Sequence, residues 1–120
     1  VPEANPRAPV GKCIGVFVDR YIQRGDSFYE QSDYIKARLE YKNAAKIVPS
    51  SPEAIYKLGL IEEAEGNFQS AFSAFMVAEQ QDAEFIPVLL KLAEFFLIAQ
   101  RVDEANKRID IKYSNYTNLI

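Results

Sequence analysis

Hydrophobic positions along the chain recur at the spacing of α-helices from residue 18 onward. Tyr21, Gly25, Phe28 and Tyr29 illustrate the pattern, because they are four, seven and eight residues apart counted from Tyr21. Such spacing places side chains on one face of a helix and is incompatible with the alternation of a strand. Polar residues with Gly or Pro interrupt the pattern at intervals. We therefore expect six helices, over residues 18–30, 34–48, 52–65, 68–80, 85–100 and 102–113.

The residues at the predicted helix starts support these boundaries. Asp33, Ser51 and Asn67 each stand at an expected N-cap position, where a short polar side chain can accept a backbone N–H. Pro52 follows Ser51 at the first helical position, where its missing N–H has no cost. Since the predicted loops are short, consecutive helices are expected to be antiparallel neighbours.

The chain also resembles itself at an offset of 34 residues along the sequence. Gly25 recurs as Gly59, and Tyr41 recurs as Phe75 and then as Ile109. The repeated small residues include Ala37, Ala71 and Ala105, and also Ala44 and Ala78. Small residues at fixed positions allow two helix axes to approach closely, and the large residue fills the space between them. A period of this length is typical of stacked helical pairs.

This pattern resembles the tetratricopeptide repeat, a unit of two antiparallel helices with the same period. The resemblance implies an all-α fold, a right-handed α-α superhelix of three tetratricopeptide-like helical hairpins. The expected divisions are an irregular Pro-rich leader at 1–17, repeats at 18–51 and 52–85, and a degenerate third repeat with a tail at 86–120. Departures from the family pattern occur at Arg24, Glu62, Ala83 and Lys112. Residues 21–45 are similar to bacterial members associated with cell-envelope export and exopolysaccharide systems.

The amino-acid composition of the chain excludes several kinds of catalytic and binding site. The chain has no His, so a Ser-His or Cys-His nucleophile system is excluded. Cys13 is the only cysteine, which excludes an intrachain disulfide and a cysteine-based zinc site. Net charge is −3, of the wrong sign for nucleic-acid binding, and no apolar run is long enough to span a membrane. Glu62, Glu63 and Glu65 are interpreted as a solvated acidic face, with a bound hard cation as the alternative. We expect no enzyme activity, cofactor or metal.

The family resemblance indicates where a partner would bind. In tetratricopeptide repeats, the first helix of each pair lines a concave groove. Transferred by register, the groove residues here are Asp19, Ile22, Asp26, Tyr29, Glu53, Tyr56, Leu60, Glu63, Leu90, Glu94 and Leu97. Glu30, Ala64, Pro87 and Ile98 occupy the remaining positions of the same register. No Lys or Arg occurs among these positions, whereas residues 34–48 carry several. The implied function is a non-catalytic scaffold that binds a protein or peptide with basic and apolar residues.

One well-known groove of this family clamps the C-terminal carboxylate of heat-shock chaperones with Lys and Asn side chains. The corresponding positions here are Ile22, Asp26, Lys57, Pro87 and Lys91, and most do not match. Asp26 would repel a carboxylate. The sequence therefore predicts no binding of such chaperone tails.

The helix expected at 85–100 is apolar nearly all round, which is unusual for a surface helix. One interpretation is that its second side belongs to the core, and another is that it forms an interface. Residues 113–120 carry no charge, although a terminal repeat normally has a polar outer face. Two hypotheses follow: the chain is part of a longer array, or it forms a homo-oligomer through its C-terminal half. The alternative function is thus a self-association or assembly module. The compartment stays open between a bacterial cytoplasm and the periplasm or cell envelope.

Overall fold

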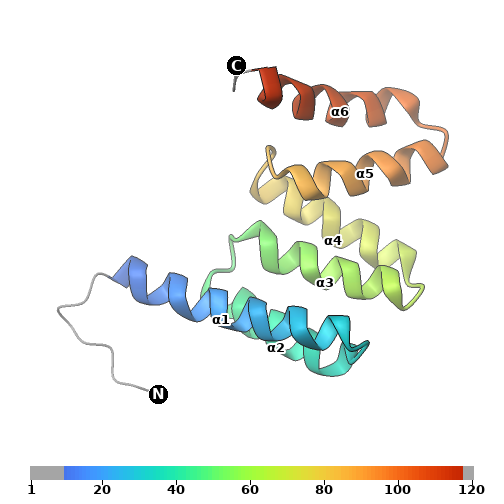
Figure 1. The fold of residues 1–120 in the computed structure, drawn as a ribbon. Helices are drawn as coiled ribbons and strands as arrows, with labels where there is room; N and C mark the ends of the chain where they lie inside the picture. Colours follow the sequence, from blue (N-terminus) through green and yellow to red (C-terminus); the bar gives the residue numbers. More distant parts are fainter. Residues whose placement is uncertain (1–9, 118–120) are drawn as a thin grey trace. The chain divides into compact units, whose positions relative to one another are not determined.

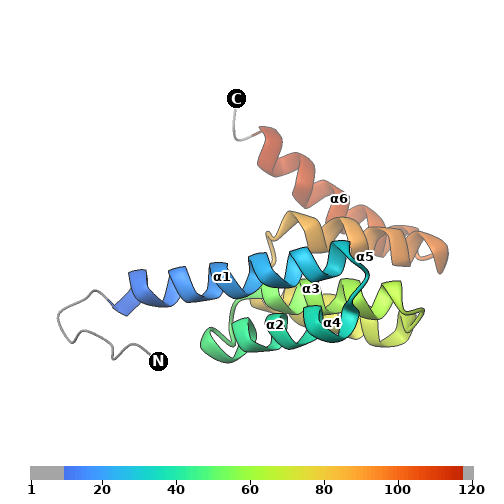
Figure 2. The ribbon, with the colours of Figure 1, turned by 60° about the horizontal axis from the view of Figure 1, so that its bottom comes forward.

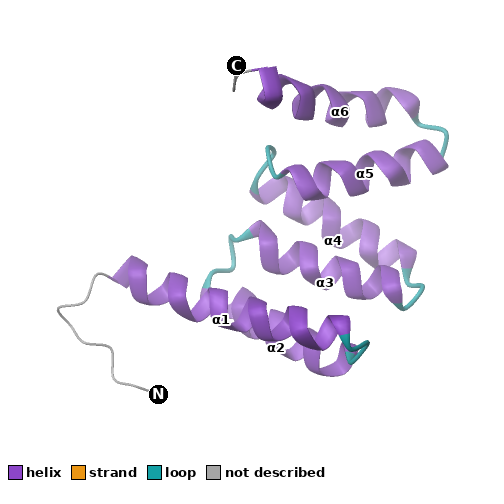
Figure 3. Ribbon diagram, viewed as in Figure 1, coloured by secondary structure: helices purple, strands orange, loops and turns teal. Residues whose placement is uncertain are grey.

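A computed structural model describes the backbone of residues 10–117 and the side chains of residues 15–111. Within residues 10–117, six α-helices follow one another along the chain (Figures 1 and 3). They are α1 (Val10–Glu30), α2 (Tyr34–Ile47), α3 (Pro52–Ala64), α4 (Phe68–Gln81), α5 (Ile86–Ile98) and α6 (Val102–Thr117). Residues 10–117 contain no strand. The predicted all-α fold of helical hairpins is confirmed.

Helix α1 starts earlier than the sequence pattern predicts. It begins at Val10, inside the segment expected to be an irregular leader, and not at residue 18. Pro9 is the last proline before this helix, and Gly11 and Gly15 disfavour a helix only by about 1 kcal/mol each relative to alanine. After Pro9, the two glycines are therefore too weakly unfavourable to prevent a helix. Helix α6 likewise runs to Thr117, past the expected end at residue 113. The rest of the leader, residues 1–9, lies outside the described residues.

The chain divides into two compact units, 1–50 and 51–120. The described part of the first unit is the hairpin of α1 and α2, which lie side by side in both ribbon views (Figures 1 and 2). Its core contains Val18, Ile22, Ala37, Tyr41 and Ala44. Gly25 lies directly against the ring of buried Tyr41, and a Cβ atom at this position would overlap that ring. Close approach of α1 and α2 therefore depends on the absence of a side chain at residue 25.

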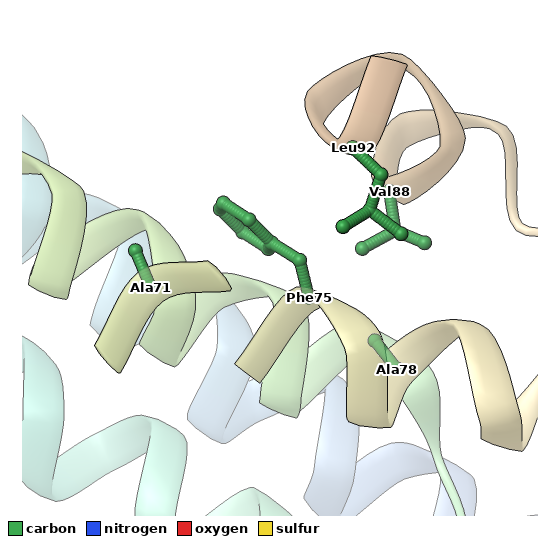
Figure 4. Packing of buried hydrophobic residues seen from close by; sticks show 5 residues of the cluster. All are labelled: Ala71, Phe75, Ala78, Val88 and Leu92. Carbon is green, nitrogen blue, oxygen red and sulfur yellow. The ribbon is translucent and has the colours of Figure 1, made fainter. Parts of the chain in front are cut away.

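The second unit contains two hairpins, α3 with α4 and α5 with α6, which meet where α4 contacts α5. Ala71, Phe75 and Ala78 from α4 pack against Val88 and Leu92 from α5 (Figure 4). These five residues are fully buried and form a cluster within the core of the unit. Phe72 joins the same interface, with ring centroids 5.9 Å from Phe95 and 5.5 Å from Phe96. The right-handed sense of a superhelix depends on the placement of successive hairpins and stays a prediction.

The same turn closes each of the three hairpins. Ser32, Gly66 and Gln100 stand at equivalent positions of successive repeats and have φ angles of 60°, 83° and 62°. In each turn the following residue donates its N–H to the carbonyl five residues earlier, as Asn67 does to Glu62 at 2.8 Å. This is the Schellman motif, whose left-handed residue is usually glycine. Only Gly66 meets that preference, so the other two turns form despite an unfavourable side chain.

The predicted caps are confirmed in position, and only one acts through its side chain. Asp33 accepts a hydrogen bond from the backbone N–H of Lys36 at 3.3 Å. Ser51 and Asn67 stand at N-cap positions without a side-chain capping bond. The side-chain amide of Asn67 instead donates to Glu62 at 3.1 Å, which ties the turn to the end of α3.

A buried arginine fastens α6 to the remainder of the second unit. Arg108 is 8% exposed, and its Nε and Nη2 atoms lie 2.8 Å and 2.9 Å from the two carboxylate oxygens of Glu79 on α4. Its Nη1 atom lies 3.1 Å from Glu104, and the guanidinium carbon is 4.5 Å from the ring centroid of Phe96. Ala74 occupies the equivalent position one repeat earlier. At this position the third hairpin is thus held by ion pairs of an arginine, whereas the second hairpin has an alanine.

Candidate partner-binding surface

The predicted groove residues of α1 are largely engaged within the first unit. Ile22 is buried at 5% exposure and belongs to the core, because it lies on the same side of α1 as Val18 and Gly25. Asp26 is half-buried and accepts a hydrogen bond from the hydroxyl of Tyr41 at 2.5 Å. Burial and this bond to a carboxylate raise the pKa of Tyr41, which keeps the hydroxyl protonated.

Of the other α1 residues, Tyr29 is half-buried and Asp19 is exposed. The Tyr29 ring lies 5.6 Å from that of Tyr34 on α2, so it helps to close the hairpin. Asp19 is solvent-exposed. Among the four predicted α1 residues, Asp19 therefore offers the most accessible side chain for a partner.

In the second unit, the predicted groove residues lie on α3 and α5, two helices that both pack against α4. Tyr56 of α3 is half-buried, with its ring 5.8 Å from Phe75 and 5.6 Å from Phe85. Leu60 packs against the same core cluster. Glu53 and Glu63 are also half-buried, toward opposite ends of α3. The side of α3 that carries these residues thus has an apolar, aromatic middle between two carboxylates.

Lys91 connects α3 to α5. Its Nζ atom lies 2.8 Å from Glu63 of α3 and 3.8 Å from Glu94 of α5. Burial lowers the pKa of Lys91, but the hydrogen bond and the charges of Glu63 and Glu94 outweigh burial and leave the pKa raised. The prediction of a surface without Lys or Arg therefore overlooked an ammonium group between the predicted positions. Two carboxylates and one ammonium leave this cluster with a charge of −1.

The apolar helix α5 divides into a core side and an exposed side. Val88, Leu89, Leu92 and Ala93 are buried. Pro87 near the start of the helix is exposed, as are Leu90, Glu94, Leu97 and Ile98, and these last four residues are called the α5 face. Ile98 is 83% exposed and Leu97 is 49% exposed. The core interpretation thus accounts for one side of this helix only, because the other side presents leucine and isoleucine to solvent, and an interface on that side stays a prediction.

Other candidate chemistry from the sequence is sparse in the described part of the chain. Among residues 15–111, whose side chains the structure describes, no group of three or more His, Cys, Asp or Glu residues is able to hold a metal ion. No helix within residues 10–117 is both long and apolar enough to cross a membrane. Glu62 of the acidic cluster accepts a hydrogen bond from Asn67. The side chains of Cys13 and of the uncharged tail at 113–120 lie outside the described residues.

Comparison with known proteins agrees with this architecture. Residues 25–66 match the family model described as "TPR repeat", the tetratricopeptide repeat. A search of curated proteins found no match. Given the repeat match over residues 25–66 and the helical hairpins, the chain resembles tetratricopeptide repeat proteins. Proteins of this class are generally non-catalytic adaptors, and their fold is that of a protein–protein interaction scaffold.

Two solved structures share the fold at low sequence identity. One is the crystal structure of MamA, with a TM-score of 0.70 and 19% identity over 84% of this chain and 59% of that chain. The other is the CopN–Scc3 complex, with a TM-score of 0.62 and 16% identity over 92% of this chain and 68% of the matched chain. The chain thus spans 59% of the MamA chain. Identities of this size show similarity of fold alone.

Proposed function

We propose that this chain is a non-catalytic scaffold that binds a protein segment with basic and apolar residues. The binding surface is formed by α3 and α5 of the second unit. The observation that carries the proposal is the α5 face, where exposed Leu90, Leu97 and Ile98 flank the carboxylate of Glu94. Exposed apolar side chains grouped on one helix are typical of an interaction surface.

The proposal also specifies the chemistry of the partner. Apolar side chains would cover Leu97 and Ile98, and a Lys or Arg would pair with Glu94, whose side chain is 64% exposed. Glu53 at the start of α3 adds a second carboxylate to the same unit. The paired Glu63 and Lys91 hold α3 and α5 together, so the surface is formed before a partner arrives.

The ion pairs of Lys91 also bear on the predicted lack of binding to chaperone tails. Lys91 is the position equivalent to a carboxylate-clamp lysine, but it already contacts Glu63 and Glu94. A C-terminal carboxylate would have to displace one of them and then face the other. We therefore expect a peptide with a free C-terminal carboxylate to bind no better than the same peptide with an amidated end.

Two designed helical peptides test the proposal. One carries Leu and Lys along a single face, and the other carries Leu and Glu in the same arrangement. We expect the basic peptide to bind at least about 10-fold more tightly, because only its charges complement Glu94. The L97D variant should lose this binding, since a carboxylate would replace an apolar contact.

The control variant is S73D, which introduces the same carboxylate at an exposed position of α4. Isothermal titration calorimetry on the three proteins provides the measurement. Equal affinity for both peptides, or wild-type affinity in L97D, would show that the α5 face is not the binding surface.

A further inference from the structure

A second exposed apolar stripe lies on α2, in the first unit. Ile35, Leu39, Lys42 and Lys46 are separated by four, three and four residues, which aligns them along one side of the helix. All four are exposed, and Ile35 is 80% exposed. We call these four residues the α2 face. It combines two apolar side chains with two ammonium groups.

The α2 face and the α5 face have complementary chemistry. One carries Ile35 and Leu39 with two lysines, and the other carries Leu97 and Ile98 with Glu94. The proposed function requires a partner segment with basic and apolar residues, and the α2 face is such a segment. From this complementarity we propose that a second copy of this chain is a partner, with its α2 face bound to the α5 face of the first copy. The inference rests on the proposed function, because it uses the same surface and names its occupant.

The spacing of residues along the two helices allows a specific register. In an antiparallel pairing with Leu39 opposite Leu97, Lys42 falls opposite Glu94, because each is three residues from its leucine. Lys46 then lies opposite Leu90, since both are four residues further on, and the methylene chain of a lysine can cover an apolar side chain. In the same register Ile35 falls opposite residue 101, about one helical turn beyond Ile98 at the end of the α5 face.

The contact joins two different faces, so it is heterologous. Pairing of one α2 face with one α5 face leaves an unused face of each kind in the pair, which permits further copies to add. A single helix-to-helix contact is also small, so association is expected to be weak and concentration-dependent. Because opposite charges attract through solvent at its edge, the association should weaken as salt is raised.

Charge reversal provides the test, with analytical ultracentrifugation as the measurement. The average mass of the wild-type chain should rise between about 20 µM and about 500 µM. The variants K42E and E94K should each associate at least about 10-fold more weakly, because each opposes like charges in the paired register. The double variant K42E/E94K should regain association to within about 3-fold of wild type.

An equimolar mixture of the two single variants gives a second, independent check. The new carboxylate at position 42 of one variant would face the new ammonium group at position 94 of the other, and their remaining faces would pair as in the wild type. The mixture should therefore associate more tightly than either variant does alone. The control is K36E, which makes the same charge change on α2 about a quarter turn away from Ile35. Far-UV circular dichroism confirms that all variants keep their helices.

Each outcome separates this inference from the proposed function. A wild-type chain that stays monomeric throughout the range overturns self-association, and the proposed function stands if the basic peptide still binds. Association that persists unchanged in K42E and E94K overturns the α2–α5 pairing. Failure of both the double variant and the mixture to regain association also overturns it. Loss of basic-peptide binding in a chain that still self-associates contradicts the proposed function instead.

Discussion

Replacement of Gly59 by alanine should destabilise the second unit, although alanine is the better helix former. A Cβ atom at residue 59 would lie 2.6 Å from Cε1 and 2.9 Å from Cδ1 of Phe75, and 3.2 Å from Cβ of Ala74. Phe75 is fully buried, so its ring has no free space into which to move. Overpacking of this kind costs about 1–3 kcal/mol. The gain in helix propensity offsets at most about 1 kcal/mol of that cost.

Because two of these contacts are shorter than 3.0 Å and Phe75 is fully buried, we expect an overpacking cost in the upper part of that range, about 2–3 kcal/mol, which leaves a net loss in the free energy of unfolding of about 1–2 kcal/mol. Urea denaturation followed by far-UV circular dichroism measures it. The matched control is Gly15→Ala, because Gly15 is an exposed helical glycine and a Cβ atom added there would have no neighbour within 4 Å. This control should be neutral or stabilising by up to about 1 kcal/mol.

The third repeat suggests a compensating change. There, Ala93 occupies the position of Gly59, and Ile109 occupies the position of Phe75. The double variant Gly59→Ala, Phe75→Ile should be less destabilised than the sum of the two single variants, with a coupling of about 0.5–3 kcal/mol. A Gly59→Ala variant as stable as wild type, or strictly additive effects in the cycle, would refute the close-packing explanation of the repeated glycine.

Three further predictions concern the turns and the buried arginine. Gly66→Ala should lower the free energy of unfolding by about 1 kcal/mol, because the positive φ at this position is unfavourable for a residue with a side chain. Ser32→Gly should not lower it, because glycine adopts the positive φ at this position without that penalty. Chemical denaturation measures both. Glu79→Ala should cost about 2–4 kcal/mol by leaving Arg108 with one carboxylate partner instead of two, and retention of wild-type stability would exclude a structural role for the pair. Hydrogen bonds from Arg108 and Lys107 lower the pKa of Glu104 below its ordinary 4.5, so its contribution to stability is present above that pH and declines as pH falls through the lowered pKa. Glu104→Gln should therefore reduce the loss of stability on acidification below about pH 4.5, as measured by thermal unfolding at a series of pH values.

The number and order of the helices could be predicted because the fold repeats a simple packing rule. Gly25 and Gly59 face the rings of Tyr41 and Phe75, and the same pairing appears in both hairpins. The first two repeats thus show the same pairing of a glycine with an aromatic ring, and the repetition supports the helix assignment. The cap at Asp33 was also predictable, because a short carboxylate side chain before an apolar run has few other roles.

The turns at Ser32 and Gln100 could not be identified from their residue types. Neither residue favours positive φ, and the conformation is imposed by the hydrogen bonds of the closing motif. Comparison with Gly66, which holds the equivalent position of the second repeat, was the available signal. The start of α1 at Val10 was missed because the prolines up to Pro9, together with Gly11, indicated an irregular leader that was extended to residue 17.

The binding surface was predicted by register, and register alone does not distinguish exposed from buried positions. Ile22 belongs to the core because α1 packs on α2 through the side that carries it. Lys91 was assigned to a different role, and its contact with Glu63 joins residues 28 positions apart, which no local pattern reveals. Arg108 was not singled out at all, since its partner Glu79 lies on another helix.

The ion pair between Arg108 and Glu79 has a consequence for how such a chain could grow by duplication. A copy of residues 52–85 inserted in place of the third repeat would bring alanine to the position of the guanidinium group. Glu79 would then lose its counterion in a confined site. The second and third repeats therefore depend on one another through this ion pair, and exchanging them would leave Glu79 without its partner.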